Sequence, residues 1–322
     1  MTSRQSSICK SSRFVGFPGI CFLMCGNRYR SHRTRCQLIC AEENLKWLRG
    51  GLCPASGRGG KSIVSLDGNV GVVTGAGSGI GKAIAVALAR AGAHVVIADL
   101  SEPAGQAAVR AVEAIGGKAM LQRTDVSRRE EAKQLIETTV DQFGRVDILV
   151  NNAGLQHVAP IQDFPEEKWD LLIGVMLTGA FLLSKYAFAH MMRQGFGRII
   201  NIASAHGLVA SPYKAAYVSA KHGLLGLTKV LAIEGAAHNI TAVAVCPGYV
   251  RTPLVERQIA DQAKAHGISE REVMEKVLLV PQAIKRLLEP EEVAEIVAFL
   301  CSDAAKGITG SQVAVDLGWT AQ

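Results

Sequence analysis

The sequence predicts an α/β fold in which a doubly wound parallel sheet carries helices on both faces. From residue 70 onward, short apolar runs alternate with longer segments of helical periodicity, which is the order of elements in such a sheet. Most of the short runs are apolar throughout, as expected for strands that are covered on both faces. The content of 48% hydrophobic and 20% charged residues supports a large core and excludes a disordered chain.

The first half of this region is expected to hold four strands and three helices. Strand Val70–Thr74 precedes helix Gly79–Ala91, in which Ile80, Ile84 and Leu88 form an apolar stripe. Gly92 beyond it is a typical helix end. The same periodicity assigns strand Val95–Ala98, helix Glu102–Ile115, strand Ala119–Arg123, helix Ser127–Phe143 and strand Ile148–Val150.

The second half repeats the pattern with longer helices. Pro290 is expected to begin a helix, because proline suits the first helical turn and Glu291 and Glu292 complement the helix dipole. The other expected elements are helices Glu166–Arg193 and Ala215–Ala237 and strands Arg198–Ile202, Thr241–Val245 and Val313–Val315. About seven strands and six helices over residues 67–322, without an internal linker, predict a single domain.

Residues 1–66 are expected to form a separate extension rich in cysteine, serine and arginine. They hold 11 Lys and Arg, two acidic residues and six of the eight cysteines, and they show no sustained periodicity. This composition is typical of an organellar transit peptide. A signal peptide built on the apolar run Phe14–Cys25 and an unstructured extension are alternatives. We therefore expect the segment to be disordered or to serve targeting.

The charge of the remaining chain excludes several classes of function. Residues 67–322 hold 24 basic and 26 acidic residues, so the domain has no basic excess that would attract nucleic acid. The run Phe14–Cys25 is too short to span a bilayer, and we expect no membrane association. The domain itself is typical of a reducing interior, which predicts a cytoplasmic protein, or a mitochondrial matrix protein if the extension is a transit peptide.

The cysteines do not indicate a metal site. Cys21 and Cys25, like Cys36 and Cys40, are spaced as pairs, but the chain around them lacks the frame of a structural zinc site. We therefore expect no bound metal.

A glycine-rich segment, Thr74-Gly75-Ala76-Gly77-Ser78-Gly79-Ile80-Gly81, follows the first strand and opens the first helix. Glycine permits a tight turn and a close approach of the backbone to a phosphate, and the helix N-terminus presents unpaired N–H groups to the anion. The spacing differs from the usual G-x-G-x-x-G, but its place between a strand and a helix favours a dinucleotide site. The expected contacts are Gly75, Ser78, Gly79, Ile80 and Gly81.

Residues at the ends of the next three strands are expected to complete this site. Asp99 ends the second strand, 24 residues beyond Gly75, where a carboxylate accepts ribose hydroxyl groups and repels a 2′-phosphate. The expected cofactor is therefore NAD. Ligands bind at the carboxyl ends of strands in such sheets, so the other candidate contacts are Asp125, Val126, Asn152, Ala153 and Gly154.

Tyr217, Lys221 and Ser204 are the candidate catalytic residues. Tyr217 and Lys221 lie four residues apart on one face of a predicted helix, and Ser204 lies at the end of the preceding strand. A cation close to a tyrosine lowers the pKa of the phenol from about 10 by about 1 to 3 units. This would make Tyr217 a general base for an alcohol, with Ser204 as the hydrogen-bonding partner of the reacting oxygen.

Across residues 67–322 the chain resembles the short-chain dehydrogenase/reductase family. The matching features are the loop Thr74–Gly81, Asn151–Gly154, Ser204, Tyr217 with Lys221, and Pro247-Gly248. The resemblance implies a Rossmann fold, a nicotinamide cofactor and a homotetramer. It also implies that Tyr217 and Lys221 contact the cofactor, Lys221 at the nicotinamide ribose, and that Pro247, Gly248, Val250 and Thr252 bind it as well.

A closer resemblance is to the bacterial-type D-3-hydroxybutyrate dehydrogenases within that family. It is carried by Gly154–His157, Asn201–Tyr217, Pro247–Ile259 and the ending Gly318-Trp319-Thr320. It implies reversible, NAD-dependent oxidation of (R)-3-hydroxybutyrate to acetoacetate, a reaction of ketone body metabolism. The implied substrate contacts are Gln156, His206, Lys214 and Gln258 on the carboxylate, Trp319 at the small acyl end, and Ser204 and Tyr217 on the hydroxyl group.

Two departures from the family pattern leave alternatives open. Met176 stands where the family commonly has an asparagine that supports a helix distortion and a relay water, and Tyr249 replaces the tryptophan usual in the closer group. One alternative is another short-chain oxidoreductase, such as a 3-oxoacyl reductase, which would prefer NADPH. Asp99 and the absence of a basic residue near Ser78 argue against the binding of NADPH. The other is a weakly active or non-catalytic NAD-binding homologue.

Overall fold

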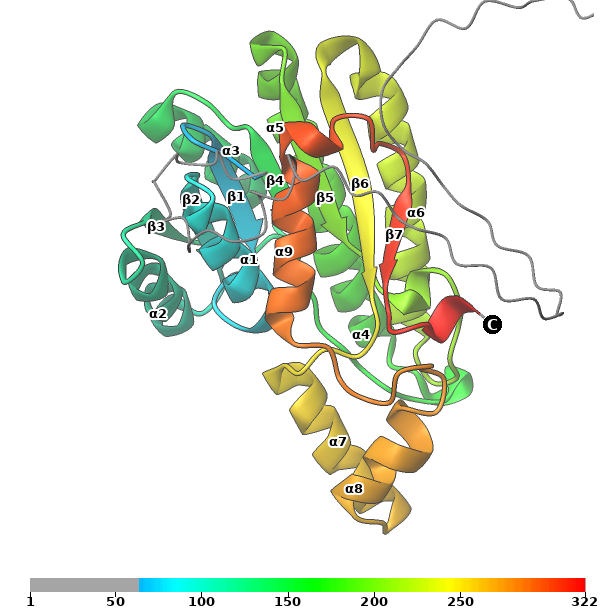
Figure 1. Ribbon diagram of the computed structural model, residues 1–322. Coiled ribbons are helices and arrows are strands. Elements are labelled where there is room, and N and C mark those ends of the chain that lie inside the picture. Colours follow the sequence, from blue (N-terminus) through cyan, green and yellow to red (C-terminus); the bar gives the residue numbers. More distant parts are fainter. Residues whose placement is uncertain (1–63, 322) are drawn as a thin grey trace, which may run out of the picture. The chain divides into compact units, whose positions relative to one another are not determined.

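A seven-stranded parallel sheet organises the computed structural model, which describes residues 64–321 (Figure 1). The strand order is β3-β2-β1-β4-β5-β6-β7, so the order reverses between β1 and β4. All neighbouring strands pair in parallel. The strands are β1 Val70–Thr74, β2 His94–Asp99, β3 Lys118–Arg123, β4 Ile148–Asn151, β5 Gly197–Ile202, β6 Ile240–Pro247 and β7 Gln312–Val315.

Helices cover both faces of this sheet. Alternate strand residues divide between two buried clusters, with Val73 packing against α1, α2 and α9, and its neighbour Val72 against α3, α5 and α6. Figure 1 shows α1 and α9 side by side on the first face. The helices are α1 Gly79–Arg90, α2 Glu102–Glu113, α3 Arg129–Phe143, α4 Glu166–Ile173, α5 Gly179–Gln194, α6 Ala215–Gly235, α7 Pro253–His266, α8 Glu270–Val273 and α9 Pro290–Cys301.

The predicted fold is confirmed, and each predicted strand matches an observed one to within two residues. The helix expected to begin at Ser127 starts at Arg129 instead. Asp125 causes the difference, because its carboxylate accepts hydrogen bonds from the backbone N–H and the hydroxyl group of Ser127 and closes a turn there.

The expected helix Glu166–Arg193 is divided by one wide turn. A π-helical turn, Gly174–Thr178, lies between α4 and α5 and has Met176 at its centre. By length and composition the run Glu166–Gln194 is the one helix among residues 64–321 that could cross a membrane. It packs on the sheet through Leu182 and Leu183, which is the position of a core helix.

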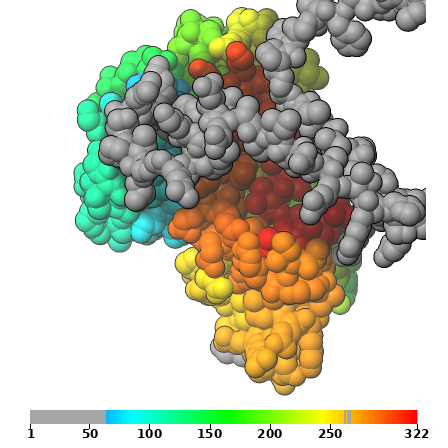
Figure 2. All heavy atoms as spheres, in the orientation of Figure 1, coloured from blue at the N-terminus to red at the C-terminus, as the bar shows by residue number. Residues whose placement is uncertain are grey.

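Helices α7 and α8 did not follow from the periodicity, because their apolar positions form no long stripe. Local signals for α7 are nonetheless present: Thr252 is its N-cap, with its hydroxyl oxygen accepting a bond from the N–H of Val255, and Pro253 opens the first turn. The two helices share a small core that includes Ile259 and Val273. They project beyond the carboxyl end of the sheet and appear as the yellow and orange mass at the lower end of Figure 2.

The start of the folded region includes the last residue of the predicted extension. The side chain of Leu66 is 2% exposed in the core, and its backbone N–H donates to the carbonyl oxygen of Ala91 at 2.7 Å. The expectations that the extension is disordered or serves targeting, and that its cysteines bind no metal, concern residues 1–63, which lie outside those the structure describes, and they stay predictions.

Candidate active site

The glycine-rich loop between β1 and α1 is attached to the end of β4. The side-chain Nδ2 of Asn152 donates to the carbonyl oxygens of Thr74 and Gly75, and the Thr74 hydroxyl oxygen accepts from the N–H groups of Asn152 and Ala153. Gly75 has φ +61°, and a Cβ added there would lie 2.9 Å from the Cα of Ala153. Glycine is required at this position for both reasons.

The N-terminus of α1 is suited to bind an anion. Its N-cap Ser78 makes no side-chain capping hydrogen bond, and its first turn holds no acidic residue. The N–H groups of Gly79, Ile80 and Gly81 therefore have no helical partner and face outward along the helix axis. Thr252 is brought next to this turn, since a Cβ on Gly79 would lie 3.0 Å from its methyl carbon. These residues fit a pyrophosphate group.

Asp99 supports the same loop from the end of β2. One carboxylate oxygen accepts from the N–H of Gly77 at 2.8 Å, and the other accepts from the N–H of Ser101 at 2.9 Å. Each oxygen keeps a further lone pair, and the side chain lines the neighbouring cavity. The geometry fits a carboxylate that accepts hydrogen bonds from ribose hydroxyl groups.

A cavity of about 430 Å³ lies along the carboxyl ends of the strands and collects every candidate site residue. The cofactor candidates on its wall are Gly75, Ser78, Gly79, Ile80, Gly81, Asp99, Asp125, Val126, Asn152, Ala153, Gly154, Tyr217, Lys221, Pro247, Gly248, Val250 and Thr252. The substrate candidates on its wall are Gln156, Ser204, His206, Lys214, Tyr217, Gln258 and Trp319. The structure thus brings all of them together, although the carboxylate of Asp125 is occupied by Ser127.

The three catalytic candidates come from two consecutive elements. Ser204 follows β5, and its hydroxyl oxygen accepts from the N–H of His206 at 3.1 Å. Tyr217 and Lys221 lie one turn apart on α6, with the lysine Nζ 5.5 Å from the centre of the tyrosine ring. Lys221 is buried and donates to the carbonyl oxygen of Ile202 at 2.6 Å, which fixes its ammonium group beneath the cavity.

The expected lowering of the Tyr217 pKa by Lys221 is wrong. Burial raises the pKa of the phenol, and only a hydrogen bond with Ser204 opposes that rise. Burial also lowers the pKa of the Lys221 ammonium group to about 8. Removal from water disfavours the charged form of both side chains and has the largest effect on both pKa values. The phenol is therefore protonated at neutral pH.

The substrate candidates all line the same cavity as the catalytic residues. Lys214 is buried, which lowers the pKa of its ammonium group to about 8. Two amide atoms, Nε2 of Gln258 and Oε1 of Gln156, are buried without a hydrogen-bond partner in the described part of the chain. An amide can turn by 180°, so Gln156 can present its donor as well. Such a set fits a small carboxylate.

His206 is neutral in this environment. Burial and then the charge of Lys214 lower the pKa of its imidazole to about 3. Its Nε2 lies 2.8 Å from the Ser211 hydroxyl oxygen, and its ring meets Trp319 edge-on at 4.9 Å and Tyr217 at 6.0 Å. This residue connects the carboxylate end of the cavity with the catalytic residues.

The C-terminal segment supplies the wall at this end. The carboxylate of Asp316 accepts from the N–H groups of Gly318 and Thr320 and holds Trp319 in place. Tyr249 stacks on Trp319 with ring centres 5.1 Å apart. Sequence reasoning noted Tyr249 only as a departure from the family and missed its place in the site. The adjoining Pro247-Gly248 was the signal that could have indicated it.

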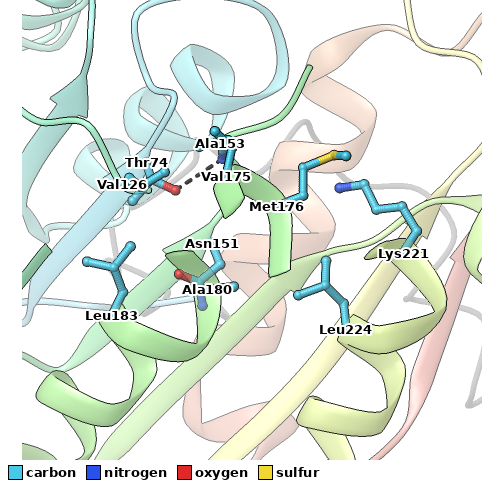
Figure 3. A pocket seen from close by; sticks show the side chains of 10 residues that line it. All are labelled: Thr74, Val126, Asn151, Ala153, Val175, Met176, Ala180, Leu183, Lys221 and Leu224. Carbon is cyan, nitrogen blue, oxygen red and sulfur yellow. Dashed lines mark hydrogen bonds between the residues drawn. The ribbon is translucent and has the colours of Figure 1, made fainter. Parts of the chain in front are cut away.

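Met176 lies directly behind the catalytic residues. Its side chain is 2% exposed and packs with Leu172, Ala216 and Ala220. Figure 3 shows the ends of Met176 and Lys221 pointing toward one another across a second cavity of about 10 Å³. The helix distortion thus forms with methionine at its centre, so the side-chain amide is not needed to create it.

Comparison with known proteins decides the family. A family model described as enoyl-(acyl carrier protein) reductase matches residues 75–320. The chain belongs to the short-chain dehydrogenase/reductase family. Members of this family are oxidoreductases that typically use NAD or NADP, which agrees with the cavity and its catalytic residues.

Individual members are similar over nearly their whole length. The D-beta-hydroxybutyrate dehydrogenase of Rhizobium meliloti is 48% identical over 256 residues, covering 78% of this chain and 98% of the relative. That of Cupriavidus necator is 42% identical over 257 residues, covering 80% and 100%. A solved short-chain dehydrogenase/reductase from Mycobacterium marinum is 32% identical with a TM-score of 0.73, covering 80% of this chain and 98% of its own.

Proposed function

We propose that this protein is an NAD-dependent dehydrogenase that reversibly oxidises (R)-3-hydroxybutyrate to acetoacetate. The observation that carries the proposal is the buried Lys214 ammonium group together with the unpartnered amides of Gln156 and Gln258, in the same cavity as Ser204 and Tyr217. A monocarboxylate fits this polar set, and a secondary hydroxyl group fits Ser204 and Tyr217. The two similar D-beta-hydroxybutyrate dehydrogenases support this assignment.

The residues that would hold NAD are those of the loop, the α1 N-terminus and Asp99. The α1 N–H groups fit the pyrophosphate, and Asp99 accepts from the ribose hydroxyl groups and repels a 2′-phosphate. As the family resemblance implies, Lys221 would bond the nicotinamide ribose. When bound, this cofactor supplies an acceptor for the hydride that leaves C3 of the hydroxy acid.

The protein groups move the proton and orient the substrate. The hydroxyl group of Ser204 bonds the reacting oxygen, and Tyr217 takes the hydroxyl proton as the C3–H bond breaks, so the alcohol loses one proton and one hydride. In the reverse direction Tyr217 returns the proton to the ketone oxygen. Because burial keeps the phenol protonated at neutral pH, oxidation is expected to accelerate at alkaline pH.

Steady-state kinetics tests this function directly. We expect turnover of (R)-3-hydroxybutyrate with NAD, at least about tenfold slower turnover with NADP, and little with the S enantiomer. Acetoacetyl thioester with NADPH is the substrate pair of the alternative 3-oxoacyl reductase. Preference for that pair, or absence of turnover with every pair, would contradict the proposal.

A further inference from the structure

Tyr249 is the hydrogen-bond partner of the buried cation at the substrate end of the cavity. The Lys214 Nζ donates to the Tyr249 hydroxyl oxygen at 3.3 Å and lies 5.4 Å from the centre of its ring. Lys214 is 7% exposed, and none of the carboxylates whose side chains the structure describes forms an ion pair with it. A buried ammonium group held by a neutral oxygen retains its capacity to bind an anion.

The position of the phenol is fixed from three sides. The N–H of Leu288 donates to the carbonyl oxygen of Tyr249 at 2.9 Å, which ties its backbone to the segment that precedes α9. The ring stacks on Trp319 at an interplanar angle of 20°. It also packs against the core of the two projecting helices, which includes Ile259 and Val273. The hydroxyl group is therefore a rigid part of the site.

The proton of this hydroxyl group is available to a ligand. The oxygen accepts from Lys214, while the O–H itself has no protein acceptor among the described residues. Burial raises the pKa of Tyr249 to about 12, so the phenol keeps its proton at neutral pH. A carboxylate that reaches Lys214 meets a second donor beside it, and each donor strengthens the other through the shared bond.

We propose that Tyr249 is a specificity-determining residue, whose hydroxyl group positions the Lys214 ammonium group and donates its own proton to the carboxylate of the bound substrate. The inference rests on the proposed function and adds a residue to it. Its stacked ring, together with Trp319, also closes the cavity beyond the short acyl chain. An indole at this position would lack the oxygen that accepts from Lys214.

The variant Tyr249→Phe tests the role, because it removes the hydroxyl group and keeps the ring. For (R)-3-hydroxybutyrate we expect KM to rise about tenfold with little change in kcat, since a hydrogen bond to a charged group is lost. For the neutral methyl ester of the same acid we expect no such rise. The matched control is Tyr213→Phe, which removes a phenol hydroxyl from an exposed side chain next to Lys214.

An unchanged KM for the acid, or an equal rise in KM for the ester, overturns the inference. A wild-type enzyme that turns over neither compound contradicts the proposed function instead. In that event the Lys214 side chain is titrated by NMR in the wild type and in Tyr249→Phe. A lower Lys214 pKa in the variant supports the positioning role, because the ammonium group has lost its acceptor, and an unchanged Lys214 pKa overturns it.

Discussion

At the scale of single residues, the site combines buried charges with groups that have free hydrogen-bonding capacity. Lys221 and Lys214 are both removed from water, yet Lys221 bonds a backbone carbonyl and Lys214 a phenol, and among the described side chains no carboxylate pairs with either. Each therefore remains able to bind a ligand oxygen. These hydrogen bonds to neutral oxygens offset part of the free-energy cost of burying two cations, and a bound anionic ligand would offset more of it.

Tyr217→Phe should reduce kcat at least about 100-fold, because the general acid and base is removed. Binding of NADH, measured by fluorescence titration, should persist, because the other cofactor candidates stay in place. Tyr186→Phe on α5 is the control, since it removes a partly buried phenol hydroxyl outside the cavity. Retention of full activity by Tyr217→Phe would show that another group transfers the proton.

At the scale of elements, the π-helical turn Gly174–Thr178 shapes the floor of the active site. It places Met176 against α6, directly beside Lys221. The small cavity between them is close to the size of one water molecule. An asparagine at this position would add polar atoms to a lining that is otherwise mostly apolar.

Met176→Asn should therefore raise kcat, because the amide can bond a water next to Lys221. The same change should lower the free energy of unfolding by about 1 to 3 kcal/mol, since the amide is buried among Leu172, Ala216 and Ala220. Both quantities are measurable, by steady-state kinetics and by urea denaturation. Met192→Asn, on the exposed side of α5, is the control. An unchanged or lower kcat would count against this role of the amide.

At the scale of the whole molecule, the parallel sheet brings the ends of all its strands to one edge, where the substrate and cofactor candidates meet. The predicted homotetramer stays a prediction. Large apolar side chains remain exposed on α5 and α6 at Phe181, Val230 and Ile233, and another copy of the chain could cover them.

The acid stability of the whole fold should depend on His206. Its pKa is about 3 in the folded protein and about 6.5 in an unfolded chain. Between these values the unfolded state binds one more proton, so the free energy of unfolding falls as the pH decreases, by about 1.4 kcal/mol per pH unit. Above pH 6.5 the contribution of His206 to the free energy of unfolding is fully present.

Urea denaturation at several pH values between 7 and 4 measures this dependence. In His206→Gln this additional pH dependence of the free energy of unfolding should be absent. The difference between wild type and variant therefore gives the contribution of His206 alone. His238→Gln, in the short turn directly after α6, is the matched histidine control. Parallel pH profiles for wild type and His206→Gln would contradict the assignment.

The sequence by itself determined the order of the strands and of the helices other than α7 and α8, the glycine loop and the grouping of Ser204, Tyr217 and Lys221, because periodicity and local spacing encode these features directly. Only the tertiary structure decided the pKa of Tyr217, the partner of Lys214 and the place of Tyr249. Burial and contact between Lys214 and Tyr249, 35 residues apart, depend on how whole elements pack. No local pattern records such a contact, so the chemistry of the substrate end became visible only in the folded chain.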